Sequence, residues 1–200
     1  PARYRLLVQL QTLKLIIGEH AMRIEREKTA AVCIDYQEKI LPAVFESEQL
    51  IENSTKLLNG LKTLEIPIYL TQQYTKGLGA TVPEICRAAG TKDYLEKLSY
   101  SAYPKLREVL PFPEEKPYVV VCGIESHVCV LQTALDLKAN GYQPYLVADC
   151  VSSRKRGDYE MALERIRQEG GLLTTYEAIL FELQKEAGNL TSKAIQKIVK

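Results

Sequence analysis

Short apolar runs of the buried-strand type alternate with segments of helical periodicity along most of the chain. The apolar runs predict strands over residues 29–34, 66–70, 94–98, 118–122, 143–148 and 172–174. Apolar positions three or four residues apart, with Pro and Gly punctuation, predict helices over residues 48–64, 82–88, 104–110, 128–140, 158–169, 176–185 and 191–200. This alternation is typical of an α/β protein with a mostly parallel sheet and helices on both faces. We therefore predict a three-layer, Rossmann-like fold.

Length and composition support one well-buried domain, because the chain has 200 residues and 46% of them are hydrophobic. We assign this domain to residues 29–200 and regard residues 1–28 as an N-terminal extension. Met22 precedes the first strand and could be the natural start, which would make residues 1–21 an added or upstream segment. The alternative is a native segment that packs on the domain or on a neighbouring subunit.

Charge and cysteine usage exclude several classes of partner and compartment. The formal net charge is +1, from 26 basic and 25 acidic residues, which predicts no general affinity for nucleic acid or an anionic membrane. No apolar run approaches the roughly 20 residues that span a bilayer. The five cysteines are odd in number and form no CxxC pair, so we predict a reduced, cytoplasmic protein.

Three reactive side chains follow predicted strands, at the edge where parallel sheets bind their ligands. Asp35 comes directly after the first strand, Lys97 lies near the end of the third, and Cys129 lies in the first turn of the helix after the fourth. At that helix start, unpaired N–H groups and the helix dipole favour a thiolate. The three residues together predict a nucleophilic site. In it Cys129 attacks, Asp35 accepts its proton, and Lys97 stabilises the thiolate and holds Asp35 ionised.

Each of these residues also has a purely structural interpretation. A free cysteine is most often a small buried hydrophobe, which is how we interpret Cys33, Cys86, Cys122 and Cys150. Asp35 could be a turn residue at a strand end, and Lys97, beside an acidic neighbour, could be a solvated surface charge.

Several other polar features of the chain favour structural roles. Asp149 either braces the 123–129 turn or only ends its strand, and His127 either lines the pocket or an interface at a helix start. The Gly-x-Gly at Gly77 lacks a following helix signature, so no dinucleotide fingerprint is predicted. The basic run at 152–156 indicates a solvated loop rather than a nucleic-acid patch.

Three segments, residues 31–37, 96–103 and 122–134, resemble in the same order the motifs of the isochorismatase-like cysteine hydrolases. They read AVCIDYQ, EKLSYSAY and CGIESHVCVLQTA. The resemblance covers about residues 29–183, and the third motif is the most specific. Residues 71–84 further resemble the branch of metal-independent proteins described as isochorismatase domain-containing.

This resemblance implies a six-stranded parallel sheet flanked by helices, and a catalytic Asp35–Lys97–Cys129 triad. It also implies a cis peptide between Ile124 and Glu125, and an oxyanion hole formed by the backbone N–H groups of Glu125 and Cys129. Family members usually form homodimers or larger oligomers, so a homo-oligomer is expected here.

The chain also departs from part of the family. Metal-dependent nicotinamidases carry Asp-x-His after the second strand, whereas this chain has Gln72 and Gln73 there and only two histidines, His20 and His127. We therefore predict no metal and no cofactor. Glu125 either faces the pocket, where it would select a cationic or hydrogen-bond-donating substrate, or points into the protein. Our candidates for the substrate pocket are Tyr36, Gln72, Tyr74, Tyr103 and Ser126.

The function predicted from these features is hydrolysis of a small amide or related acyl compound through a covalent Cys129 intermediate. The alternative is a catalytically silent member of the family that acts as a binding or oligomeric scaffold.

Overall fold

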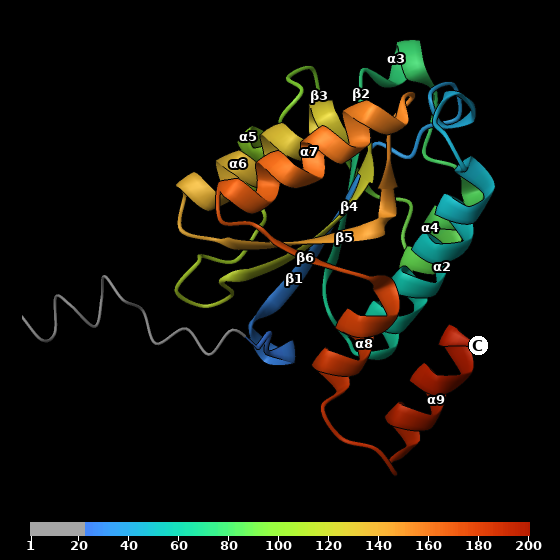
Figure 1. Cartoon of the computed structure of the whole chain (residues 1–200), viewed down its shortest axis with the longest axis vertical. Helices are drawn as coiled ribbons and strands as arrows, with labels where there is room; N and C mark the ends of the chain where they lie inside the picture. Colours follow the sequence, from blue (N-terminus) through green and yellow to red (C-terminus); the bar gives the residue numbers. More distant parts are fainter. Residues whose placement is uncertain (1–22) are drawn as a thin grey trace, which may run out of the picture.

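A computed structural model describes residues 23–200, and within them six strands form one parallel sheet (Figure 1). The strands are β1 (Thr29–Ile34), β2 (Ile68–Gln73), β3 (Tyr94–Lys97), β4 (Tyr118–Ile124), β5 (Gln143–Ser152) and β6 (Leu172–Thr174). They lie in the order β3-β2-β1-β4-β5-β6, and every neighbouring pair is parallel. This confirms the predicted α/β fold. The direction of strand progression reverses between β1 and β4, which is where sheets of this type bind ligands.

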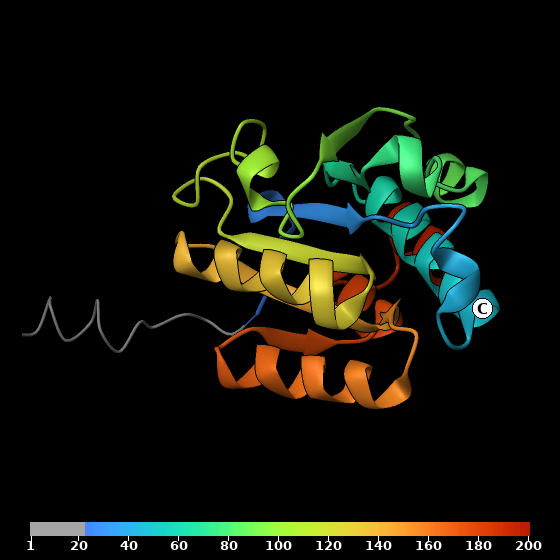
Figure 2. The same ribbon diagram turned by 90° about the horizontal axis from the view of Figure 1, so that it is seen from above.

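Helices cover both faces of the sheet (Figure 2). One face carries the helices α2 (Ser47–Thr63), α4 (Pro83–Ala89), α8 (Tyr176–Gln184) and α9 (Leu190–Val199). The other carries the helices α5 (Tyr103–Leu106), α6 (Leu131–Ala139) and α7 (Arg156–Gln168). A one-turn helix, α3 (Thr75–Leu78), follows β2. The sheet therefore separates two hydrophobic cores, which we call the α2 face and the α6 face.

The alternation of side chains along each strand decides which core a residue enters. In β1, Ala31 and Cys33 belong to the α2 face, whereas Val32 and Ile34 belong to the α6 face. Both sets are almost fully buried, as expected for the central strand of a parallel sheet covered on both sides. This explains why the sequence shows a continuous apolar run here instead of an alternating one.

Several element boundaries differ from the sequence prediction, among them those of β5, of the helix after β4 and of α5. Strand β5 extends to Ser152. Its pairing register with β4 shifts between Val121 and Gly123, where β5 contains extra residues. The helix after β4 begins with a π-helical turn, Ser126–Val130, before α6. Helix α5 ends at Leu106 instead of residue 110.

Asp149 illustrates the effect of the longer β5. It lies inside the strand, and its Oδ1 accepts the N–H of Tyr176, the first residue of α8, at 2.9 Å. It therefore stabilises the start of α8. The predicted role of Asp149 as the end of its strand was therefore wrong.

Residues just before β1 pack on the domain. Ile24 is fully buried on the α2 face, and its N–H donates to Glu182 at 3.1 Å. The Arg26 Nε donates to the Leu64 carbonyl at 2.6 Å. The predictions for residues 1–21, including His20, lie outside the described residues. Across residues 23–200, no helix combines the length and apolar character needed to cross a bilayer.

Candidate active site

Asp35 and Lys97 form an ion pair at the carboxyl edge of the sheet. The Lys97 Nζ lies 2.6 Å from the Asp35 Oδ2, and the two side chains are only 1% and 2% exposed. Asp35 follows β1 with a left-handed backbone (φ 53°), and Thr71 of β2 donates its hydroxyl to the Asp35 Oδ1 at 2.7 Å. Burial of both charges is tolerated because each is paired and hydrogen-bonded. Lys97 is therefore not the solvated surface charge of the structural interpretation.

The Lys97 ammonium is surrounded by acceptors from the protein. Its Nζ donates to the Gln73 Oε1 at 2.6 Å, to the Tyr100 carbonyl at 3.0 Å and to the Ser99 carbonyl at 3.3 Å. An ammonium has three N–H donors, and the Asp35 contact is a fourth interaction. All donors of Lys97 thus have partners within the protein.

Cys129 lies in the π-helical turn after β4 and packs on the α6 face, with 7% of its surface exposed. Burial and the Asp35 carboxylate raise the pKa of its thiol to about 12, while the Lys97 ammonium opposes them. The thiol interacts with both charged side chains, so the structure brings together the three residues predicted for the site. Desolvation and the nearby carboxylate thus oppose the thiolate that the helix start is predicted to favour.

The backbone between β4 and Cys129 has two unusual features. Gly123 adopts a φ of 137°, and a Cβ there would lie 2.2 Å from the Ile34 carbonyl oxygen of β1. Only glycine fits this close approach of the two strands. The next peptide, Ile124–Glu125, is cis. The turn toward Cys129 therefore starts where β4 passes close to the Ile34 backbone of β1.

Thr133 ties the Cys129 turn to the loop after Lys97. Its Oγ1 donates to the Cys129 carbonyl at 2.6 Å and accepts the Ala102 N–H at 2.9 Å. Thr133 is fully buried. It therefore fixes the distance between the two segments that carry Cys129 and Lys97.

Glu125 forms an ion pair with Arg154. Its Oε1 accepts the Nε of Arg154 at 2.9 Å and the backbone N–H of the same residue at 3.2 Å. The Glu125 side chain is 7% exposed and that of Arg154 is 62% exposed. The charge of Glu125 is thus paired. Nearby, the His127 Nδ1 lies 3.0 Å from the Ser153 hydroxyl.

Two pocket candidates lie away from Cys129. Tyr36 is fully buried on the α2 face, where its hydroxyl donates to the Cys150 carbonyl and lies 2.7 Å from the Ser54 hydroxyl. The side chain of Gln72 points to the opposite face of the sheet from those of its strand neighbours. Its Nε2 donates to the Thr81 hydroxyl at 3.0 Å on the α2 face. Neither side chain reaches the α6 face, so we do not include them in the proposed pocket.

The other three candidates lie on segments that border the triad. Tyr74 is half exposed, and its N–H donates to the Lys97 carbonyl at 3.0 Å. Tyr103 is partly buried on the α6 face and packs edge-on against Tyr142. Ser126 is fully buried at the start of the Cys129 turn, and its Oγ has no hydrogen-bond partner.

Sequence reasoning assigned no role in this site to Thr71 and Gln73. Both lie on β2 two positions apart, so both point to the face that carries Cys129. Continuing the period-2 alternation of β2 forward from Tyr69 would have selected residues 71 and 73 and excluded Gln72. Among residues 23–200, no three side chains of His, Cys, Asp or Glu gather in a group that could hold a metal ion.

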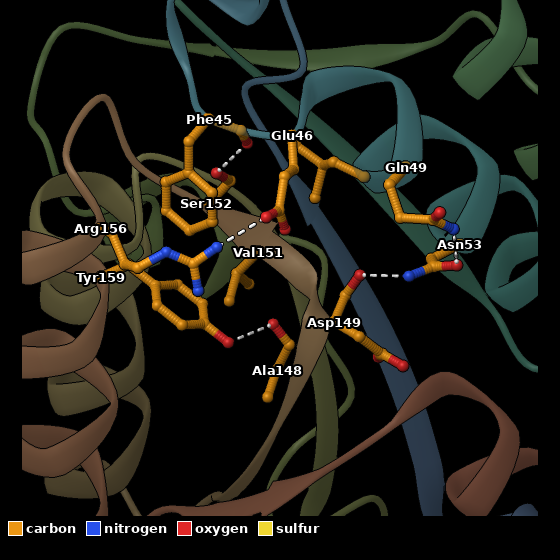
Figure 3. A pocket seen from close by; sticks show the side chains of 11 residues that line it. Phe45, Glu46, Gln49, Asn53, Ala148, Asp149, Val151, Ser152, Arg156 and Tyr159 are labelled. Atoms are coloured by element: carbon orange, nitrogen blue, oxygen red, sulfur yellow. Dashed lines mark hydrogen bonds and ion pairs between the residues drawn. The ribbon is translucent and has the colours of Figure 1, made fainter.

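A separate cavity of about 110 Å³ lies between α2, the end of β5 and α7 (Figure 3). Its polar side chains pair with one another or with nearby backbone: the Arg156 Nη2 lies 2.6 Å from the Glu46 Oε1, and the Tyr159 hydroxyl donates to the Ala148 carbonyl at 3.1 Å. None of the triad residues lines it. These contacts hold the 45–46 segment against α7, apart from the candidate site.

Known proteins match this chain over most of the domain that the structure describes. The family model described as Isochorismatase domain matches residues 29–178. The chain belongs to the isochorismatase domain family. It is 38% identical over 178 residues to isochorismatase domain-containing protein 2A of Mus musculus, which covers 89% of this chain and 85% of the mouse protein.

Two solved structures illustrate the similarity of the fold. The MAR1 ribonuclease of Caenorhabditis elegans superposes with a TM-score of 0.79 at 33% identity, covering 88% of this chain and 92% of that one. The YcaC gene product of Escherichia coli, described as an octameric hydrolase of unknown specificity, superposes with a TM-score of 0.77. Its identity is 22%, over 84% of this chain and 85% of that one, so this second likeness shows the fold alone.

Proposed function

We propose that this member of the isochorismatase-like hydrolase superfamily hydrolyses a C–N bond in a small amide or related acyl compound without a metal. The observation that carries the proposal is the buried Asp35–Lys97 pair beside the Cys129 thiol. A thiol, a carboxylate and a cation in contact, at the point where the strand order reverses, provide a nucleophile, a base and a compensating charge.

In the proposed first step, the Cys129 Sγ adds to the substrate carbonyl carbon while its proton passes to Asp35. This transfer is needed because the raised thiol pKa of about 12 leaves the free protein with a neutral thiol. The negative charge that develops on the carbonyl oxygen is stabilised by the backbone N–H groups of Glu125 and Cys129. Lys97 stays bonded within the protein and balances the charge of Asp35.

The intermediate then collapses. The C–N bond breaks, the leaving amine takes the proton from Asp35, and the acyl group remains on Cys129 as a thioester. Water attacks this thioester with Asp35 as base, which releases the carboxylic acid and restores the thiol. Ser126, with its unpartnered buried hydroxyl, and Tyr74 and Tyr103 at the border of the triad are the residues we propose as substrate contacts.

The test is a panel of small aliphatic and aromatic amides, with amine release as the readout and intact mass spectrometry to detect the thioester. Replacing Cys129→Ala is expected to lower kcat/KM at least about 1000-fold, as for other nucleophiles, and to abolish the acyl adduct. Cys150→Ala removes a buried thiol on the opposite face of the sheet. It serves as the matched control and is expected to retain activity. Turnover that survives in Cys129→Ala would contradict the proposal.

A silent scaffold is the second candidate, and the low exposure of the site favours it. The three triad residues expose 7% of their surface or less. If no amide in the panel turns over and no acyl adduct forms on Cys129, the scaffold is the better description. The name of the nematode relative suggests RNA as another substrate, but the net charge of +1 here provides no general attraction for a polyanion.

We further propose a cytoplasmic homo-oligomer. Support for the compartment comes from the five cysteines, all free and four of them buried. Support for the assembly comes from the octameric YcaC structure. Light scattering on the purified chain at two concentrations tests the assembly, and a monomer at both would contradict it.

A further inference from the structure

Gln73 contacts the ammonium of the candidate triad but is not one of its three residues. Its Oε1 accepts the Lys97 N–H at 2.6 Å, as short as the contact between Lys97 and Asp35. Its Nε2 donates to the Leu98 carbonyl at 2.8 Å, which fixes which end of the amide faces Lys97. The side chain therefore presents an oriented acceptor to a buried cation.

The backbone of Gln73 is held in turn by Gln37, two residues after Asp35. The Gln37 Oε1 accepts the Gln73 N–H at 2.7 Å, and the Gln37 Nε2 donates to the Gln73 carbonyl at 3.0 Å. The same Nε2 also donates to the Gly79 carbonyl at 2.7 Å, and Gln37 is fully buried. The turn that carries Asp35 thus also positions the second acceptor of Lys97.

We propose that Gln73, held by Gln37, is a positioning residue that orients the Lys97 ammonium against Asp35 and beside Cys129. This inference rests on the proposed function. In this arrangement Lys97 acts by its charge. Its donors are all used within the protein, so it makes no hydrogen bond to the substrate. A buried ammonium N–H that loses its acceptor must find another partner. If it finds none, the charged form of the amine is destabilised.

The neighbouring Gln72 provides a matched control. It is the same residue type on the same strand and is more deeply buried than the partly buried Gln73, but its side chain lies on the α2 face and bonds to Thr81. We compare Gln73→Met with Gln72→Met, since Met approximates the shape of Gln and cannot accept a comparable hydrogen bond.

The first measurement is the exchange of the lysine ammonium protons with water by ¹H–¹⁵N NMR. In the wild type, the Lys97 protons are expected to exchange at least about tenfold more slowly than those of Lys105, whose side chain is 48% exposed. Gln73→Met is expected to speed up Lys97 exchange at least about threefold, and Gln72→Met to leave it unchanged. Wild-type Lys97 exchange as fast as that of Lys105 overturns the proposal without any variant.

The second measurement is the rate at which iodoacetamide alkylates Cys129 between pH 7 and 10. A weaker positive charge beside the thiol disfavours the thiolate, so Gln73→Met is expected to react about three- to tenfold more slowly at each pH. Gln72→Met is expected to match the wild type. Equal rates in both variants, with the wild type still turning over an amide, reject the role of Gln73 alone. An absence of amide turnover in the wild type rejects the proposed function, while the NMR comparison still decides whether Gln73 orients Lys97.

Discussion

Two sets of buried cysteines lie on opposite faces of the same sheet and differ in what surrounds them. Cys129 is on the α6 face in contact with a carboxylate and an ammonium. Cys33, Cys122 and Cys150 are on the α2 face, packed among Tyr36 and aliphatic side chains. Burial raises the thiol pKa of Cys129 on one face and raises those of Cys33 and Cys150 on the other well above the ordinary value. A buried thiol therefore becomes a candidate nucleophile through its charged neighbours, since desolvation alone makes it inert.

The largest expected effect comes from removing the cation. Lys97→Met leaves the Asp35 carboxylate, 2% exposed, without its ion pair and is expected to destabilise the fold by about 3–5 kcal/mol. Urea unfolding measures this loss. Lys105→Met is the control, because its pair with Glu108 is exposed at 3.7 Å, and it is expected to cost less than about 1 kcal/mol. Similar losses for the two variants would mean that the buried pair is no different from a surface pair.

Alkaline pH tests what the two sets of thiols have in common. The ordinary thiol pKa of 9.0 applies to the unfolded chain, whereas that of Cys129 in the fold is about 12. As the pH rises above 9, the unfolded chain loses this proton first, so the free energy of unfolding falls by up to about 1.4 kcal/mol per pH unit. The contribution is complete below pH 9 and disappears toward pH 12.

Urea titrations between pH 8 and about 10.5 measure this slope. Cys129→Ala and Cys150→Ala are each expected to make the pH dependence shallower, because both remove a thiol whose pKa burial raises. A slope unchanged in Cys129→Ala would contradict the raised pKa.

The charge of Asp35 distinguishes Cys129 from Cys150 on the α2 face. Asp35 is the second cause of the raised pKa of Cys129 and has no part in that of Cys150. Asp35→Asn is therefore expected to lower the Cys129 pKa and to speed its alkylation by iodoacetamide about tenfold at pH 8, while amide hydrolysis falls because the base is lost. Peptide mapping measures the extent of alkylation at Cys129 and at Cys150. Asp149→Asn is the control, and slower alkylation of Cys129 in Asp35→Asn would contradict the electrostatic account.

The smallest expected effect concerns the contact that holds the Cys129 turn. Thr133→Val removes the hydroxyl that joins the Cys129 carbonyl to the Ala102 N–H and is expected to cost about 1–2 kcal/mol. Thr63→Val, which loses only a bond to the Asn59 carbonyl on the outside of α2, is expected to cost less. Thermal melts compare the two, and an equal loss would assign no special role to Thr133.

Much of the site was predictable because its residues sit where strands end. Asp35 and Cys129 follow runs that the apolar pattern identifies, Lys97 is the last residue of β3, and parallel strands bring their ends to one edge. The roles of Thr71 and Gln73 were missed because the end of β2 was placed three residues too early, at residue 70. Tyr36 was wrongly placed at the pocket, since a position one residue after Asp35 does not reveal which face the chain enters after a left-handed turn.

By itself, the sequence determined the α/β class, five of the six strands to within three residues at either end, and the three reactive residues, because these depend on local periodicity and on motif order. Only the tertiary structure decided the protonation of Cys129, the partner of Glu125 and the four contacts of Lys97. Those properties depend on distances and burial among segments up to about a hundred residues apart, and electrostatic energies change steeply with both. The thiol is the clearest example: its place at a helix start predicted a thiolate, whereas its burial in the fold beside Asp35 raises its pKa.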